Sequence, residues 1–244
     1  MDSIHRTLDP ESQSLPEVDK DKYHLRELEI ARSPGDPRRI MPPILESYRR
    51  ILDVGCGAGQ TLIASNIAPQ VEAVGLDVDH SALRLGSQLE KKIHFVCAKG
   101  EALPFPNEHF DFVYSRVALP YMHLQKTLAE MWRVLCLGGS IWVVLHPLSI
   151  TLKDMIRSLF RLEIKGTIHC LYVMTNGAVI HFFGTEVSLP FRNEQYESFQ
   201  TVRGVSRLLR GLGFEDIKIS KSNFFVATAR KTDHHADLSV DPGS

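Results

Sequence analysis

The segment Ile51-Leu-Asp-Val-Gly-Cys-Gly-Ala-Gly-Gln60 constrains the fold most, because an apolar run leads directly into a glycine-rich turn. Gly55, Gly57 and Gly59 have no Cβ, so the backbone of this turn can pass close to a bound molecule. If a helix begins after the turn, its first N–H groups have no partner within that helix. The segment therefore predicts a buried strand, a tight turn and a helix that together bind a ligand.

The same segment opens a regular alternation of strand-like and helix-like stretches. Apolar runs typical of strands lie at 51–54, 71–77, 93–98, 110–115 and 140–146, and helical patterns fall between them near 60–68, 80–90 and 124–135. Strands that alternate with helices form a parallel sheet covered on both faces. Continuous apolar runs such as 140–146 fit strands that are buried on both sides.

The alternation stops between residues 147 and 200. The stretch 151–162 has an apolar helical face opposite a basic one, and two apolar runs flank Asn176-Gly177, a dipeptide that favours a two-residue hairpin turn. We expect a helix plus a β-hairpin, inserted before the last helix (202–213, capped by Gly213) and two antiparallel strands (215–220 and 223–230). The expected fold class is thus α/β, a doubly wound, mostly parallel, seven-stranded Rossmann-like sheet with this insertion.

The two ends of the chain differ from this central domain. Residues 1–22 are polar and contain two prolines, which predicts a mobile arm, and residues 232–244 predict a disordered tail. One domain is expected over 23–231, with one or two short helices in 23–48 and an acceptor or lid region in 147–200. The basic face of 151–162 could also rest on an anionic membrane, but Asp154 and Glu163 interrupt its charge and favour a lid.

Charge and cysteine content restrict the partners. Lys plus Arg number 28 and Asp plus Glu number 29, so the chain lacks the basic excess of proteins that bind a nucleic-acid backbone. The four cysteines form no C-x-x-C pair, and no metal site is expected. The first residues carry acids rather than a signal-peptide pattern, and no stretch is apolar enough to span a membrane, which favours a cytoplasmic protein. The oligomeric state cannot be read from the sequence.

Asp77, at the expected carboxyl end of the second strand, is the next polar residue that indicates ligand binding. It lies 18 positions after Gly59, where a carboxylate can accept both hydroxyls of a ribose. NAD and S-adenosylmethionine (SAM) both place an adenosine ribose there. The dinucleotide fingerprint G-x-G-x-x-G, however, has its third glycine where this chain has Gln60. Asp53 would repel a pyrophosphate and suits the cationic amino group of a methionine, so glycine spacing and charge both favour SAM.

From about residue 45 to 146, the chain resembles the class I SAM-dependent methyltransferases, in the branch of ubiquinone and menaquinone biosynthesis enzymes. The resemblance rests on five segments in order: LDVGCGAG, the acid of VGLDV, GEALPFPNEHFDFVYS, EMWRVLCLGGSIWVV, and RLLRGLGFEDIKI with FFVATARK. Two positions depart from the family. Lys99 replaces an acid that usually accepts from the adenine amino group, and Leu137 replaces a proline in a distant turn.

This resemblance implies S-adenosyl-L-methionine as cofactor. It assigns the methionine end of SAM to the glycine-rich turn, with Ser115 beneath it, the ribose and one adenine face to the second strand's end, and the adenine border to the stretch after the third strand. The implied cofactor-binding residues are Asp53, Gly55, Cys56, Gly57, Gly59, Asp77, Val78, Gly100, Glu101, Ala102 and Ser115.

The reaction expected is transfer of the methyl group to a small-molecule acceptor that the sequence does not identify. Displacement at a sulfonium mainly needs alignment and exclusion of water, so a base is optional. The candidate catalytic residues are Arg116, which could bind an anionic acceptor, and Tyr121 and His146, with His123 and His181 as weaker alternatives. Two other functions stay open: a nucleotide-dependent oxidoreductase, and a SAM-binding-fold protein that acts as a partner or scaffold without catalysis.

Overall fold

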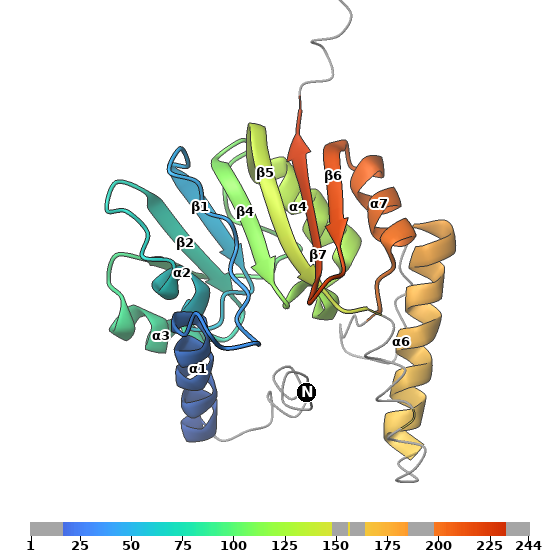
Figure 1. Cartoon of the computed structure of the whole chain (residues 1–244), viewed down its shortest axis with the longest axis horizontal. Helices are drawn as coiled ribbons and strands as arrows, with labels where there is room; N and C mark the ends of the chain where they lie inside the picture. Colours follow the sequence, from blue (N-terminus) through green and yellow to red (C-terminus); the bar gives the residue numbers. More distant parts are fainter. Residues whose placement is uncertain (1–16, 148–155, 157–163, 185–197, 233–244) are drawn as a thin grey trace, which may run out of the picture.

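The computed structural model describes residues 17–147, 156, 164–184 and 198–232 (Figure 1). Its strands are β1 (Arg50–Val54), β2 (Glu72–Asp77), β3 (His94–Cys97), β4 (Phe110–Arg116), β5 (Leu135–Leu145), β6 (Phe214–Ser220) and β7 (Phe225–Lys231). Its helices are α1 (Glu17–Arg32), α2 (Gln60–Ala64), α3 (His80–Leu89), α4 (Leu124–Val134), α6 (Ile164–Phe183) and α7 (Val202–Gly211), with a 3-10 turn η3 (Leu119–Tyr121).

The strands form one seven-stranded sheet in the order β3-β2-β1-β4-β5-β7-β6. Neighbours from β3 to β5 pair in parallel, while β7 runs antiparallel to both β5 and β6. The mostly parallel, seven-stranded sheet predicted from the sequence is therefore confirmed. The strand order reverses between β1 and β4, and in such sheets this reversal opens a crevice at the carboxyl ends of the strands.

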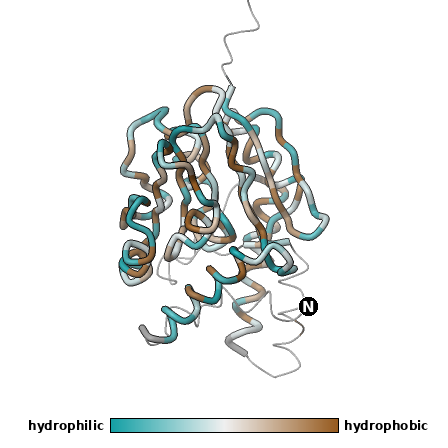
Figure 2. Tube along the Cα trace, turned by 60° about the vertical axis from the view of Figure 1, so that its left-hand side comes forward, coloured by the Kyte–Doolittle hydropathy of each residue, from teal (hydrophilic) through white to brown (hydrophobic). Residues whose placement is uncertain are grey.

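Both faces of the sheet are covered. Leu52 and Val54 of β1 join a core with α4 and α7, whereas Ile51 joins a second core with residues of α1 and α2. This split follows from the alternation of side chains along a strand. Hydrophobic colour follows the strands through the middle of the molecule in Figure 2. Asp53 consequently faces the α1 side of the sheet, the side on which the glycine-rich turn opens.

The predicted β-hairpin is wrong, because both of its apolar runs and Asn176-Gly177 lie inside the long helix α6. Cys170, Val173 and Ile180 are buried along one face of α6, and a Cβ on Gly177 would collide with the ring of Phe199. A dipeptide that favours a turn is thus held in a helix by tertiary packing. The predicted helix at 151–162 lies outside the described residues, apart from the helical residue Ile156.

The boundary of the predicted arm is also wrong, since residues 17–22 belong to α1 and only 1–16 fall outside the described part. A single helix, α1, accounts for the helical part of 23–48, and it ends before the turn at 33–39. The cap at Gly213 is confirmed by its positive φ of 89° after α7. The predicted tail lies outside the described residues beyond Thr232. None of the helices in the described residues is long and apolar enough to cross a membrane.

Candidate active site at the carboxyl edge of the sheet

The glycine-rich turn after β1 uses left-handed backbone conformations, as the sequence predicts. Gly55, Gly57 and Gly59 have φ values of 76°, 56° and 72°, which residues with a Cβ adopt at a cost. The N–H groups of Gly55 and Cys56 both donate to the carbonyl of Leu76, at 2.7 and 3.0 Å. These bonds hold the turn against β2 and leave its outer side facing the crevice.

Asp77, the last residue of β2, connects the turn to the next helix. Its Oδ2 accepts from the N–H of Gly57 at 2.8 Å, and its Oδ1 accepts from the N–H of Asp79 at 2.9 Å. Asp79 in turn caps α3 by accepting from the N–H groups of Ser81 and Ala82. Because each carboxylate oxygen has a second lone pair, Asp77 can still accept hydrogen bonds from a ligand in the crevice.

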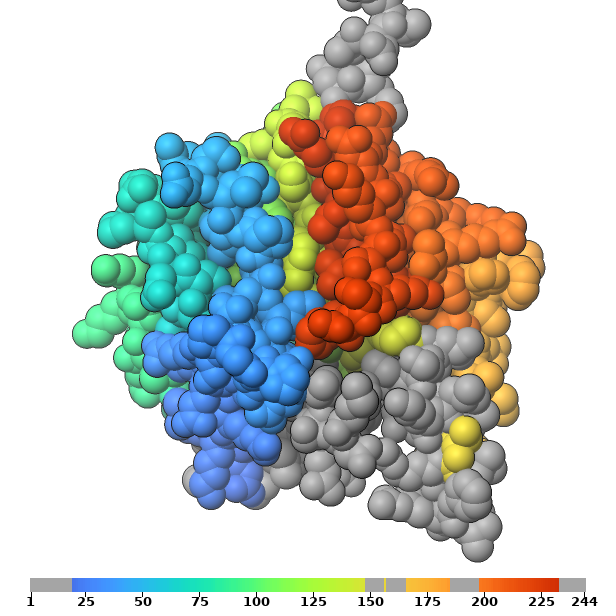
Figure 3. Space-filling view, in the orientation of Figure 1, coloured from blue at the N-terminus to red at the C-terminus, as the bar shows by residue number. Residues whose placement is uncertain are grey.

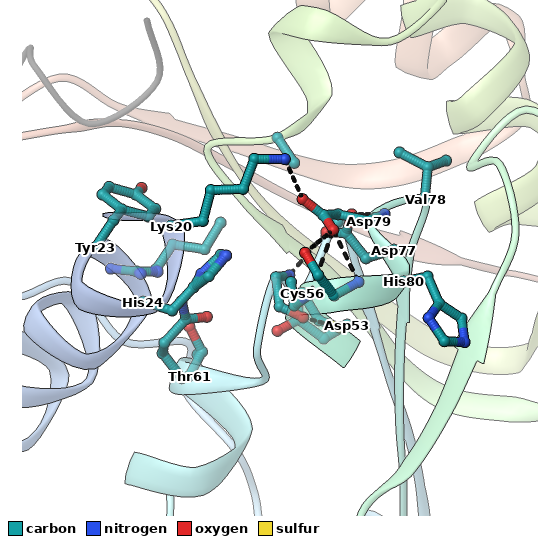
Figure 4. A pocket seen from close by; sticks show the side chains of 17 residues that line it. Lys20, Tyr23, His24, Asp53, Cys56, Thr61, Asp77, Val78, Asp79 and His80 are labelled. Carbon is teal, nitrogen blue, oxygen red and sulfur yellow. Dashed lines mark hydrogen bonds and ion pairs between the residues drawn. The ribbon is translucent and has the colours of Figure 1, made fainter. Parts of the chain in front are cut away.

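Asp79 is held in its charged form. Burial raises the pKa of its carboxyl, but hydrogen bonds from Ser81, Lys20 and the Ala82 N–H outweigh that effect and lower the pKa to about 2. The ammonium group of Lys20 lies 3.2 Å from Oδ2 of Asp79 (Figure 4). This ion pair joins α1 to the start of α3 across the opening of the crevice.

Asp53 is the buried acid of the site, with 1% of its surface exposed. Burial raises the pKa of its carboxyl to about 7, although Arg116 and Tyr114 both act to lower it. Tyr114 is its register partner on β4, yet no hydrogen bond of good geometry joins them. Asp53 Oδ1 and the Tyr114 hydroxyl are therefore both buried without a hydrogen bond of good geometry among the described residues, although Tyr114 lies close enough to lower the pKa of Asp53. Such an atom is costly unless a bound molecule supplies a donor.

The helix α1 forms the wall opposite the turn, which agrees with an expected contribution of the amino-terminal arm, but none of its pocket residues was among the predicted site residues. His24 Nδ1 lies 2.7 Å from the side-chain amide nitrogen of Gln60, and Glu27 forms an ion pair with Arg116 at 3.1 Å. Burial lowers the pKa of His24, and it raises the pKa of Tyr23. Lys20, Tyr23, His24 and Glu27 follow i, i+3, i+4, i+7 spacing, so a polar face on one side of a helix was the signal available.

These elements enclose a pocket of about 570 Å³. Its lining comes from α1, from the turn after β1, from the stretch Asp77–Ala82 and from the end of β4 with Ala118. Figure 4 shows Asp53 and Asp77 on the sheet side and the α1 side chains across from them. Of the predicted site residues, the pocket brings together Asp53, Gly55, Cys56, Gly57, Asp77, Val78 and Arg116.

The remaining predicted cofactor-binding residues are not among those that line this pocket. Gly59 packs against Phe95, and Ser115 is buried and donates to the Val54 carbonyl at 2.7 Å. Gly100 packs against Met122, while Glu101 accepts from the N–H of His123 at 2.8 Å. Gly100, Glu101 and Ala102 follow β3 along the chain. Their adenine contacts stay a prediction.

Two of the three predicted catalytic residues also lie outside the lining. Tyr121 and His146 contact each other edge to face, with ring centroids 5.4 Å apart. The N–H of His146 donates to the side-chain oxygen of Gln200, and the carbonyl of His146 accepts from the N–H of Gln200. His181 lies on α6, with Nδ1 2.7 Å from the hydroxyl of Thr201, the residue that caps α7. Arg116 is the predicted catalytic residue that reaches the pocket.

Known proteins match the part of the chain that contains the glycine-rich turn. The family described as "Methyltransferase domain" matches residues 52–143. Over 177 residues the chain is 29% identical to demethylmenaquinone methyltransferase of Deinococcus radiodurans, covering 70% of each protein. Over 104 residues it is 36% identical to the ubiquinone/menaquinone biosynthesis C-methyltransferase of Ectopseudomonas mendocina, covering 39% of this chain and 41% of that protein. The match thus spans 70% of the first of these two relatives and less than half of the second.

Solved structures share the fold at low identity. Human N-acetylserotonin methyltransferase in complex with SAM aligns with a TM-score of 0.59 and 17% identity, over 89% of this chain and 57% of that one. The CurJ carbon methyltransferase aligns with a TM-score of 0.55 and 15% identity, over 95% of this chain and 58% of that one. The sheet order, the glycine-rich turn and the methyltransferase domain matched over residues 52–143 together support a SAM-dependent methyltransferase.

Proposed function

We propose that this enzyme methylates a ring carbon of a small hydroxylated aromatic acceptor of the quinol type: the ring carbon takes the methyl group as the sulfur–methyl bond breaks, and the proton of that carbon is then released to solvent. The names of the relatives support the acceptor class, since they include a demethylmenaquinone methyltransferase and a C-methyltransferase of quinone biosynthesis. The site supports a small molecule, because a pocket of about 570 Å³ falls within the usual range for such ligands.

The observation that carries SAM binding is the arrangement of Asp53 and Asp77 on the two sides of the glycine-rich turn. The buried, unpartnered Oδ1 of Asp53 suits the cationic amino group of the methionine end. Asp77, at the end of β2, suits the ribose hydroxyls. The residues present therefore fit SAM, which when bound supplies an electrophilic methyl group on a sulfonium.

The side chains of α1 face the same pocket and are proposed to contact the acceptor. With the Gln60 amide donating to Nδ1, the neutral His24 ring carries its proton on Nε2 and can donate to an acceptor oxygen. This tautomer is assigned from the hydrogen-bond network. Tyr23 adds an aromatic surface beside it. The chain's own contribution is then to bind and orient the ring and to exclude water from it.

Arg116 is proposed as a positioning residue rather than as a base. Its guanidinium is paired with Glu27, so it joins the end of β4 to α1 and keeps the acceptor wall in place. A guanidinium cannot accept a proton at working pH. Tyr121 and His146 stay predictions whose roles would require contacts outside the pocket.

Methyl transfer with isotopically labelled SAM tests the acceptor class. The full chain is incubated with 1,4-naphthohydroquinone, a catechol and a primary amine in separate reactions, and products are located by mass spectrometry. The proposal expects label on a ring carbon of the naphthohydroquinone, with loss of activity in Asp53→Asn. Label found only on nitrogen or oxygen, or only with the amine, would contradict the acceptor class without affecting the assignment as a methyltransferase.

A further inference from the structure

A second surface with its own chemistry lies on α6 and α7, at the edge of the molecule beyond β6 (Figures 1 and 3). Ile168, Leu171 and Phe182 of α6 are 62%, 62% and 63% exposed, and Phe183 is 75% exposed. Ile168, Leu171, Thr175 and Phe182 follow helical spacing, so they form one outward stripe. We call this stripe, with Phe183, the α6 apolar face.

The inward side of α6 is apolar as well. Cys170, Val173 and Ile180 are buried, and Gly177 packs against Phe199. A helix at the surface of a globular protein ordinarily turns polar side chains outward, and a large exposed apolar patch indicates an interaction site. The α6 apolar face therefore needs a partner that its core contacts do not supply.

The two helices themselves carry charge of one sign. Neither α6 nor α7 contains an aspartate or a glutamate, whereas α7 carries Arg203, Arg207 and Arg210. The whole chain has a net charge of −1, so this pair of helices departs from the average of the molecule. Arg207 donates to the carbonyls of His181 and Phe182, which places a cation directly beside the two exposed phenylalanines.

We propose that the α6 apolar face and the arginines of α7 bind the surface of an anionic lipid bilayer. Apolar and aromatic side chains of an interfacial helix enter the boundary between headgroups and acyl chains, while nearby arginines attract anionic lipids. A second copy of this chain is disfavoured as the partner, because a symmetric contact would set the same cationic surface against itself. The positive charge of α7 thus favours an anionic bilayer over a second copy of this chain as the partner.

The position of this surface relates it to the pocket. Gln200, two residues before α7, bonds with His146 and forms a bridge with Pro147 directly after β5. The start of α7 therefore lies at the carboxyl edge of the sheet, the edge at which the pocket opens. Binding to a bilayer through α6 and α7 would hold this edge near the lipid.

Flotation of the full chain with vesicles tests the proposal. Vesicles of phosphatidylcholine alone are compared with vesicles that also contain phosphatidylserine, at low and at high salt. We expect binding to the anionic vesicles that weakens as salt rises, because salt screens the arginine contribution. Absence of binding, or equal binding to both compositions, would overturn the proposal.

Two variants and a control locate the contact. Phe182→Ser/Phe183→Ser should reduce vesicle binding at least about tenfold, because both rings leave the lipid boundary. Arg203→Gln/Arg210→Gln should reduce it about fivefold for each arginine at low salt. Leu137→Ser, at another half-exposed leucine, should bind as the wild type does. Folding of each variant is checked by its thermal melting.

If Phe182→Ser/Phe183→Ser does not fold, Arg203→Gln/Arg210→Gln still tests the proposal. Wild-type vesicle binding that neither variant weakens would overturn the proposal. Sedimentation that shows a dimer abolished by Phe182→Ser/Phe183→Ser, without vesicle binding, would assign the face to a second copy and would also overturn it. None of these variants touches the pocket, so binding of S-adenosylhomocysteine should remain unchanged in all of them.

Discussion

Asp77 is the residue on which the geometry of the site depends most directly, because it binds two backbone N–H groups and faces the pocket. We expect Asp77→Ala to weaken binding of S-adenosylhomocysteine tenfold or more, since one hydrogen bond to a charged group contributes about 1.5–3 kcal/mol. Calorimetric titration measures this. Glu72→Gln, at the opposite end of β2, is the matched control and should bind normally. Unchanged affinity in Asp77→Ala would contradict the ribose assignment.

Asp53 should make ligand binding depend on pH. Its pKa is raised to about 7 by burial, so in the free protein the carboxyl becomes charged only as the pH approaches neutrality. A cationic ligand amino group favours the charged form, so affinity should increase from pH 5.5 to about 7 and then level off. In Asp53→Asn we expect weaker binding with little change over this interval. A wild-type affinity independent of pH would argue against contact between Asp53 and the amino group.

The raised pKa of Asp53 also predicts how the stability of the ligand-free protein changes with pH. A carboxyl whose pKa is higher in the folded than in the unfolded chain binds its proton more tightly when folded. The free energy of unfolding should therefore fall as the pH rises from about 4 to about 7, through this group alone. Urea unfolding of the wild type and Asp53→Asn at several pH values isolates this contribution. If both proteins lose stability equally over the interval, another group is responsible.

Single residues also show what the sequence could reveal of the site. Asp53 and Asp77 could be found because each lies next to a glycine-rich turn or a strand end whose position the apolar pattern fixes. Tyr23 and His24 share a helical face with other polar residues, but that pattern does not show what the face contacts, because its partners, Gln60 and Arg116, are distant in the chain. Contacts between distant segments depend on tertiary packing, which local patterns do not contain.

Among the helices and strands, α6 shows how tertiary packing overrides the local conformational preference of the sequence. A Cβ at Gly177 would collide with Phe199, so Gly177→Ala should destabilise the protein by about 1–3 kcal/mol despite the better helix propensity of alanine. Gly211→Ala is the control, because a Cβ there meets no atom within 4 Å, and it should be neutral or stabilising by up to about 1 kcal/mol. Chemical denaturation measures both. Equal behaviour of the two variants would show that Phe199 does not restrict position 177.

The helix α1 should respond to ligand, because it covers the pocket through the Lys20–Asp79 and Glu27–Arg116 ion pairs. We expect hydrogen exchange of α1 amides to slow when S-adenosylhomocysteine binds, while exchange in α4, on the other face of the sheet, stays the same. Lys20→Ala should reduce the protection at the start of α1. Equal exchange of α1 with and without ligand would contradict its role as a wall of the site.

The elements also divide into those that the sequence could predict and those that it could not. The strands β1, β2, β4 and β5 are largely buried on both faces, so their apolar runs are continuous, and the glycine-rich turn marks the end of the first of them. The insertion is different, because the run at 164–183 is apolar on most sides and carries no period that separates a helix from two strands. There the dipeptide Asn176-Gly177 was the only local signal, and packing on Phe199 opposes it.

At the scale of the whole molecule, one sheet positions two surfaces. The reversal of strand order after β1 opens the pocket that α1 covers, and β5 leads to the helix pair that carries the apolar and basic face. The mostly parallel sheet follows from the alternation of strands and helices, which the sequence shows plainly. The wall of the pocket formed by α1 does not, because α1 lies outside that alternation.

Calorimetric titration of the full chain with S-adenosylhomocysteine and, separately, with NAD shows whether the glycine-rich turn binds SAM. We expect saturable binding of S-adenosylhomocysteine at one site and no heat with NAD, since Gln60 and Asp53 disfavour a pyrophosphate at the glycine-rich turn. Absence of heat with S-adenosylhomocysteine, or binding of NAD with comparable affinity, would contradict the assignment of this turn to SAM.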